Sequence, residues 1–189
     1  MTTSRNNIML YIAIFAVFMT ECCFALSAQV NSAKPNPVVK VMANGMSLLK
    51  PAFVAEAKLQ AAVLGGSVDS DEVQKEIQSE TKSSKVVIYT YGLSPFSSEA
   101  VNILDQTGVD YNQIELGSEW FLLNGKDSLK RVLLSEYVDN GATSLPKVFV
   151  NGRCLGGCAE LAEKVESGEF DNLVGKKGGK KNSFLSFLN

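Results

Sequence analysis

The chain has 189 residues, a hydrophobic fraction of 46% and a formal net charge of −2, which allows one ordinary domain with extensions and gives no reason to expect nucleic acid as a partner. It contains no histidine, so a histidine-containing catalytic triad and a zinc site with histidine ligands are both excluded. No internal repeat and no glycine-rich phosphate loop is visible.

Residues 1–27 have the pattern of a secretory signal peptide. Arg5 precedes an unbroken apolar run over residues 8–19, and small residues follow this run. The run is too short to cross a bilayer comfortably, so we expect cleavage after Ala25 or Ser27. The alternative is an uncleaved signal anchor, which would then be the chain's contact with a membrane.

Residues 28–68 have the composition of a transit-like or linker segment. No Asp or Glu occurs between Cys22 and Ala55, and residues 51–64 have helical composition. An acid-poor, basic segment is typical of a transit peptide. A signal peptide followed by such a segment is similar to the bipartite leaders of algae whose plastids lie within the secretory pathway. We therefore expect a plastid protein, with secretion or the lumen of the endoplasmic reticulum as the alternative.

From Asp69 onward, helical and strand patterns alternate. Asp69 and Glu72 form a capping-box-like helix start, and Asn151-Gly152 is a strong two-residue hairpin signal. We expect helices from 69, over 95–106, over 128–138 and from 158, and strands over 85–91, 111–116, 148–150 and 153–155.

The loop between the first strand and the next helix is the most informative stretch. Ser94 is placed to cap this helix, and Pro95 suits its first position because the N–H that proline lacks would be unbonded there. A strand that delivers the chain to a helix N-terminus gathers backbone donors and a partial positive charge at one spot. Such a spot stabilises a thiolate or a carboxylate.

Segments of the chain resemble glutaredoxins at each of that family's landmarks, in the same order. Ser94-Pro95-Phe96-Ser97 stands in the place of Cys-Pro-Tyr-Cys, Ser144-Leu145-Pro146 in that of Thr-Val-Pro, and Gly156-Gly157-Cys158-Ala159-Glu160-Leu161 in that of Gly-Gly-Cys-Asp-Asp-Leu. The resemblance implies a thioredoxin-like (glutaredoxin) α/β fold, with a four-stranded mixed sheet, helices on both faces and a cis bond before Pro146. We place this domain at 69–175 and a basic flexible tail with an apolar tip at 176–189.

The same resemblance implies a glutathione site. The positions that correspond to the family's site are Tyr91, Ser94, Phe96, Leu145, Pro146, Gly157 and Cys158. Tyr91, however, stands where the family has a lysine that pairs with the glycyl carboxylate, and Ala159 replaces a polar residue. Loss of a charge-assisted contact costs about 1.5–3 kcal/mol. We therefore expect glutathione to be at most a weak ligand, and no cofactor to be required.

Glutaredoxin chemistry needs a thiolate at the helix N-terminus, and this chain has Ser94 and Ser97 there. The leading hypothesis is a non-catalytic or atypical member that binds a thiol, glutathione or a protein partner in redox-related processes. One enzymatic alternative is thiol exchange through Cys158, whose place at a helix start favours a thiolate. The other is a hydrogen bond from Ser94 that activates the sulfur of glutathione.

Two further expectations concern single segments. Cys154, in a strand, is expected to be an inert thiol. Whether Cys154 and Cys158 form a disulfide is left undecided, because that bond needs Cα atoms within about 7 Å. The apolar run over 120–123 has neither strand nor helix alternation. It either covers one end of the sheet or presents Trp120 and Phe121 to a protein partner.

Overall fold

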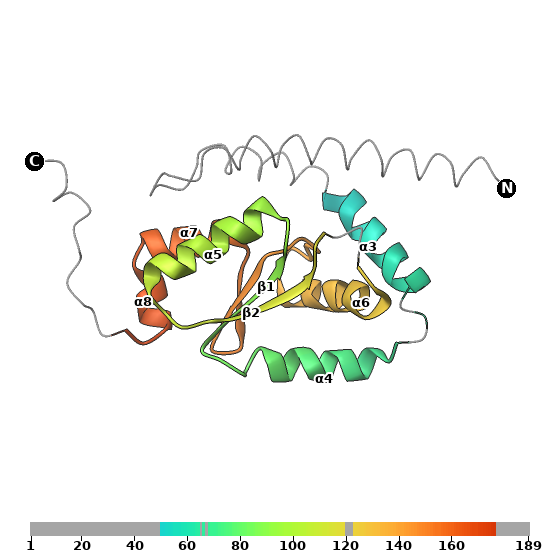
Figure 1. Ribbon diagram of the computed structural model, residues 1–189, viewed down its shortest axis with the longest axis horizontal. Helices are drawn as coiled ribbons and strands as arrows, with labels where there is room; N and C mark the ends of the chain where they lie inside the picture. Colours follow the sequence, from blue (N-terminus) through green and yellow to red (C-terminus); the bar gives the residue numbers. More distant parts are fainter. Residues whose placement is uncertain (1–49, 65, 67, 120–122, 177–189) are drawn as a thin grey trace, which may run out of the picture. The chain divides into compact units, whose positions relative to one another are not determined.

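The computed structural model describes residues 50–64, 66, 68–119 and 123–176 (Figure 1). The signal-peptide and tail predictions, and Trp120 and Phe121, lie outside these residues. The helices are α3 (Lys50–Leu64), α4 (Ser70–Glu80), α5 (Pro95–Thr107), α6 (Gly125–Leu134), the 3-10 turn η2 (Ser135–Tyr137), α7 (Cys158–Glu166) and α8 (Glu169–Leu173). The strands are β1 (Val86–Tyr91), β2 (Asn112–Gly117), β3 (Lys147–Val150) and β4 (Arg153–Gly156). Within the described ranges, no helix is both long and apolar enough to span a membrane.

The strands form one mixed sheet in the order β2-β1-β3-β4. β1 pairs in parallel with β2 and antiparallel with β3, and β3 pairs antiparallel with β4. Every residue of β1 is buried, as expected for a central strand covered on both faces. The predicted four-stranded mixed sheet is confirmed.

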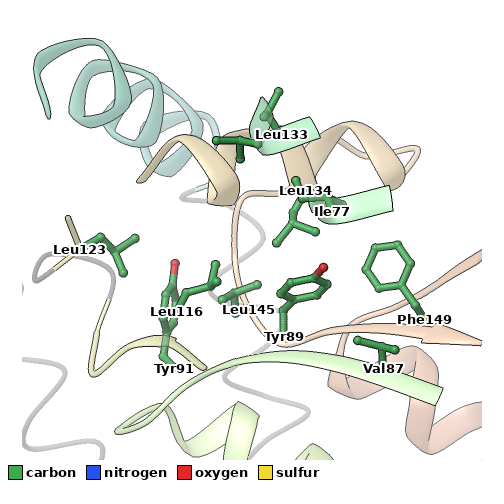
Figure 2. Packing of buried hydrophobic residues seen from close by; sticks show 11 residues of the cluster. Ile77, Val87, Tyr89, Tyr91, Leu116, Leu123, Leu133, Leu134, Leu145 and Phe149 are labelled. Atoms are coloured by element: carbon green, nitrogen blue, oxygen red, sulfur yellow. The ribbon is translucent and has the colours of Figure 1, made fainter. Parts of the chain in front are cut away.

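Alternate side chains of β1 enter two separate cores. Val86 and Ile88 pack with apolar residues of α5, α7 and α8, whereas Val87, Tyr89 and Tyr91 pack with those of α4 and α6. Figure 1 shows these two helix layers on opposite sides of the sheet. Figure 2 shows the second core. This division is the period-two alternation of a strand, and it decides which site residues share a face.

The predicted helix over 128–138 begins earlier and ends earlier in the structure. Asn124 caps α6, because its side-chain oxygen accepts a hydrogen bond of 2.9 Å from the Asp127 N–H. After Leu134 the chain tightens into η2. The expected hairpin is present, and both Asn151 and Gly152 have positive φ, 51° and 77°, as a type I′ turn requires.

The α4–α6 contact contains a buried ion-pair network. The Lys130 ammonium, with its side chain 4% exposed, lies 2.9 Å from carboxylate oxygens of both Glu76 and Glu80. The Tyr89 hydroxyl donates a hydrogen bond of 2.7 Å to Glu80. Charged side chains are rarely this buried unless they are paired, and here each has a partner.

Helix α3 packs against α6, so the folded part of the chain extends upstream of Asp69. Ala57 and Ala61 of α3 are buried, and Glu56 forms a salt bridge of 3.0 Å with Arg131 of α6. The helix expected over 51–64 therefore exists, and it contacts the body of the domain (Figure 1).

Candidate functional site

Strand pairing gathers the predicted site segments at one edge of the sheet. Tyr89 pairs with Lys147, and Val148 pairs with Gly156. The C-terminal ends of β1 and β4 therefore lie beside the N-terminal end of β3. This edge carries the loop before α5, the Leu145–Pro146 segment and the start of α7. The Leu145–Pro146 peptide bond is cis, as predicted.

The loop between β1 and α5 is held by the last residue of β2 and the residue that follows it. The Gly92 N–H donates to the Gly117 carbonyl and the Leu93 N–H to the Ser118 carbonyl, each at 2.9 Å. Gly92 also lies against the Glu115 carboxylate, since a Cβ at Gly92 would approach an oxygen of that group to 2.8 Å. A larger residue at this position would require the exposed Glu115 side chain to move.

Both serines of the Ser-Pro-Phe-Ser loop are buried and support the start of α5. The Ser94 hydroxyl oxygen accepts a hydrogen bond of 3.3 Å from the Ser97 N–H, which confirms the predicted helix cap. The Ser97 hydroxyl oxygen accepts a bond of 3.1 Å from the Tyr91 N–H. The Ser94 side chain thus satisfies a backbone donor that a helix start leaves unpaired, and the Ser97 side chain ties α5 to the last residue of β1.

Tyr91 enters the interior and does not present its side chain to solvent. Figure 2 shows its ring on the same side of β1 as Tyr89, near Leu116 and Leu123. The residue is 5% exposed, and burial raises the pKa of its hydroxyl. Among the described residues this hydroxyl has no hydrogen-bond partner.

The Leu145–Pro146 segment and the start of α7 lie side by side. A Cβ at Gly157 would lie 3.3 Å from the Pro146 carbonyl oxygen. Leu145 and Pro146 are both buried, and Leu145 belongs to the α4–α6 core. Phe96, at the start of α5, is partly buried against the opposite core. Of the predicted site residues, Pro146 and Gly157 are thus in direct proximity.

The N–H of Gly157, the N-cap residue of α7, already has a hydrogen-bond partner within this chain. The Glu160 carboxylate accepts a hydrogen bond of 2.9 Å from the Gly157 N–H. This is the side-chain half of a capping box. An incoming carboxylate at Gly157 has to displace Glu160.

Cys158 does not have the environment of a reactive thiol. Its side chain is buried in the core formed by α5, α7 and α8. Burial, reinforced by the negative charges of Glu99 and Glu160, raises its pKa to about 12. The expectation that the helix start favours a thiolate is therefore wrong, because desolvation of the charged form outweighs the helix end.

Cys154 and Cys158 are both free thiols, so the structure contains no disulfide between them. The sheet separates the two side chains. Cys154 packs on the α4–α6 side, and Cys158 packs on the α5–α7 side. Burial also raises the pKa of Cys154, against the opposing effects of a hydrogen bond from the Gly156 backbone and the charge of Lys147.

Sequence reasoning missed Arg131, a buried cation on α6 that contacts the segment before Leu145. Its Nε donates 3.1 Å to the Thr143 carbonyl, two residues before Leu145. A signal was available: residues three and four positions before the fully buried Leu134 share its helix face. Those residues are Arg131 and Lys130, and both are buried. The described residues hold no cluster of three ligating side chains suited to a metal ion.

Comparisons with known proteins agree on one family. A scan against family models finds none that matches the chain. The chain is 31% identical over 117 residues to glutaredoxin-C4 of Arabidopsis thaliana, which covers 60% of this chain and 76% of that protein. It is 30% identical over 105 residues to probable monothiol glutaredoxin 2 of Rickettsia conorii, covering 53% and 89%. Oxidized glutaredoxin 2 from Chlamydomonas reinhardtii superposes with a TM-score of 0.50 at 28% identity, covering 57% of this chain and 95% of that one.

Proposed function

The chain belongs to the glutaredoxin family, and we propose that it is a member that binds through the family's site without exchanging disulfides. The observation that carries the proposal is the pair of serines at the start of α5. Both hydroxyls are engaged by backbone N–H groups, and neither residue supplies a thiol. The ligand we propose is glutathione or a thiol-bearing protein segment, in a redox-related process.

The chemistry follows from what a serine hydroxyl lacks. Disulfide exchange begins with attack by a thiolate, and the ionised form of a serine hydroxyl is inaccessible near neutral pH without a general base. The described thiols do not replace it, because burial raises the pKa of both Cys154 and Cys158. The raised pKa of Cys158 therefore argues against the oxidoreductase alternative through that thiol.

Glutathione binding has less support here than in a family member that retains every contact of the site. The edge retains the cis Leu145–Pro146 bond and the helix start at Gly157. Tyr91 points inward, however, and Glu160 already accepts the Gly157 hydrogen bond. Each lost charge-assisted contact costs about 1.5–3 kcal/mol, which is roughly tenfold to a hundredfold in affinity. We expect weak glutathione binding.

A paired assay tests this function. The full chain should not release glutathione from a glutathionylated substrate above background, whereas calorimetric titration should detect glutathione binding. Turnover comparable to that of an active glutaredoxin contradicts the proposal, and Cys158→Ser then tells whether that thiol carries it. Absence of glutathione binding leaves only the protein-segment form of the proposal.

A second candidate function uses the Ser94 hydroxyl as a donor to the sulfur of bound glutathione. The observation in its favour is that Ser94 uses its oxygen as an acceptor from Ser97, while its own hydrogen has no acceptor in the described part of the chain. If Ser94 acts in this way, Ser94→Ala should raise the pKa of bound glutathione, read from the ultraviolet absorbance of the thiolate. An unchanged pKa contradicts this role.

A further inference from the structure

Helix α3 reaches the candidate site through one buried guanidinium. The Arg131 side chain is 2% exposed, and one of its terminal nitrogens lies 3.0 Å from a carboxylate oxygen of Glu56. The same nitrogen donates to the Gln60 side-chain oxygen at 3.4 Å. Both acceptors lie on α3, outside the range of 69–175 that the sequence predicts for the domain.

The guanidinium also holds the segment that leads into the site. Its Nε donates 3.1 Å to the Thr143 carbonyl, and the Thr143 hydroxyl donates 3.4 Å to the Phe53 carbonyl of α3. Arg131 thus binds the Thr143 carbonyl, just before Leu145–Pro146, and the Glu56 and Gln60 side chains of α3. A carboxylate bound to Arg131 therefore lies next to the segment that leads into Leu145–Pro146.

The Tyr91 hydroxyl is a second, independent indication of a ligand position. It is buried and has no hydrogen-bond partner among the described residues. Its ring packs in the α4–α6 core with Leu134 and Leu145, so the hydroxyl lies on the side of β1 that α6, the helix of Arg131, covers. A buried hydroxyl without a partner loses the hydrogen bonds it makes in water, so an acceptor that arrives on this side of the sheet would restore one.

The Glu56 carboxylate occupies its position at an electrostatic cost. Burial raises its pKa more strongly than the charge and hydrogen bond of Arg131 lower it. A planar guanidinium that is oriented by a carbonyl and partly desolvated is a strong receptor for carboxylates in general. Nothing in that chemistry distinguishes the carboxylate of Glu56 from one that arrives on a ligand.

We propose that Arg131, oriented by Thr143 on the side of β1 that also holds the Tyr91 hydroxyl, is a carboxylate-binding site that Glu56 of α3 fills in cis. Helix α3 is then a tethered competitor of any carboxylate ligand at this edge. Where that ligand is glutathione, which carries carboxylates, the inference rests on the proposed function. The tether supplies an effective concentration of roughly millimolar or more, so ligand affinity is reduced by the fraction of molecules in which Glu56 is bound.

Chemical rescue tests the site without assuming glutathione. In the full chain, Glu56→Ala removes the resident carboxylate, and acetate is the probe, with chloride at equal ionic strength as the reference. Acetate should raise the melting temperature of Glu56→Ala by at least about 2 °C over chloride, because a ligand that binds only the folded state stabilises it. Wild type and the matched control Glu72→Ala, an exposed glutamate of α4, should respond to the two salts alike. Equal responses of Glu56→Ala and wild type overturn the proposal.

If Glu56→Ala folds in neither salt, hydrogen exchange of Glu56→Gln provides a second test. Its neutral amide holds Arg131 less strongly than a carboxylate, so acetate should accelerate hydrogen exchange of the α3 backbone amides relative to chloride. Absence of that acceleration overturns the proposal.

A parallel glutathione titration separates the two ideas. Glu56→Ala should bind glutathione at least tenfold more tightly than wild type. If acetate rescues Glu56→Ala while glutathione binds neither protein, the carboxylate site stands and glutathione is not its ligand. If glutathione binds wild type while acetate gives no specific rescue, the proposed function stands and the tethered-competitor inference is refuted.

Discussion

Replacing Ser94 by cysteine tests whether the start of α5 is built to stabilise a thiolate. The Ser94 oxygen already accepts the Ser97 N–H, and a hydrogen bond to a charged acceptor is worth about 1.5–3 kcal/mol. The helix end adds roughly 0.3–1 kcal/mol. Because one pKa unit corresponds to about 1.36 kcal/mol, these effects lower the pKa of the introduced thiol by more than one unit.

Burial raises the pKa of a thiol, and at Cys158 this effect exceeds that of the helix end. The difference between the two positions is where the side chain points. Cys158 is the first residue of α7, and its sulfur packs into an apolar core near the charges of Glu99 and Glu160. Ser94 is the residue before α5, and its side chain accepts a backbone N–H. We therefore expect the thiol introduced at Ser94 to have a pKa of about 7, below the usual value near 8.5.

Alkylation rates measured against pH, resolved by peptide mass spectrometry, give this pKa directly. Ser167→Cys is the matched control, since Ser167 is exposed and caps the C-terminus of α7, where the helix end disfavours a thiolate. Ser97 stays unchanged in the first variant because its hydroxyl accepts the Tyr91 N–H. A pKa of 8.5 or higher for the thiol at Ser94 refutes the reasoning that this helix start retains the family's electrostatics.

The remaining predictions concern stability and processing. Lys130→Met should lower the free energy of unfolding by about 2 kcal/mol, less than the 3–5 kcal/mol of a fully buried pair because its carboxylate partners are partly hydrated. Lys126→Met, at a side chain 46% exposed that binds the same Glu76, should destabilise the protein less than Lys130→Met does in the same denaturant titration. Lys126 and Lys130 lower the pKa of Glu76 to about 2, from 4.5, the hydrogen bond from Lys126 acting most strongly. The stability that Glu76 contributes is therefore present above pH 4.5 and lost as the pH falls toward 2, and the difference between wild type and Glu76→Gln in thermal melts should shrink over that window. Because α3 packs on α6, sequencing of the mature N-terminus should place it before Lys50, and an N-terminus near Asp69 contradicts this.

The sequence by itself determined the features that depend on neighbouring residues. Ser94 and Pro95 predict where α5 begins, and Asn151-Gly152 predicts the hairpin, because caps and tight turns are decided by the backbone groups of adjacent residues. The β-branched and aromatic run of β1 predicts a buried central strand. Through the resemblance that they carry, the landmarks at Ser94, Pro146 and Gly157 predict a four-stranded mixed sheet with helices on both faces.

Only the tertiary structure decided the chemistry of those segments. The pKa of Cys158 depends on the core that encloses it, and helix position alone indicates the opposite direction. Tyr91 points inward because α4 and α6 cover the face of β1 that carries its side chain. The pairing of Glu56 with Arg131 joins residues 75 positions apart, and no local pattern connects them. Burial and charge pairing depend on groups that folding brings together from distant parts of the chain, so they are decided by packing.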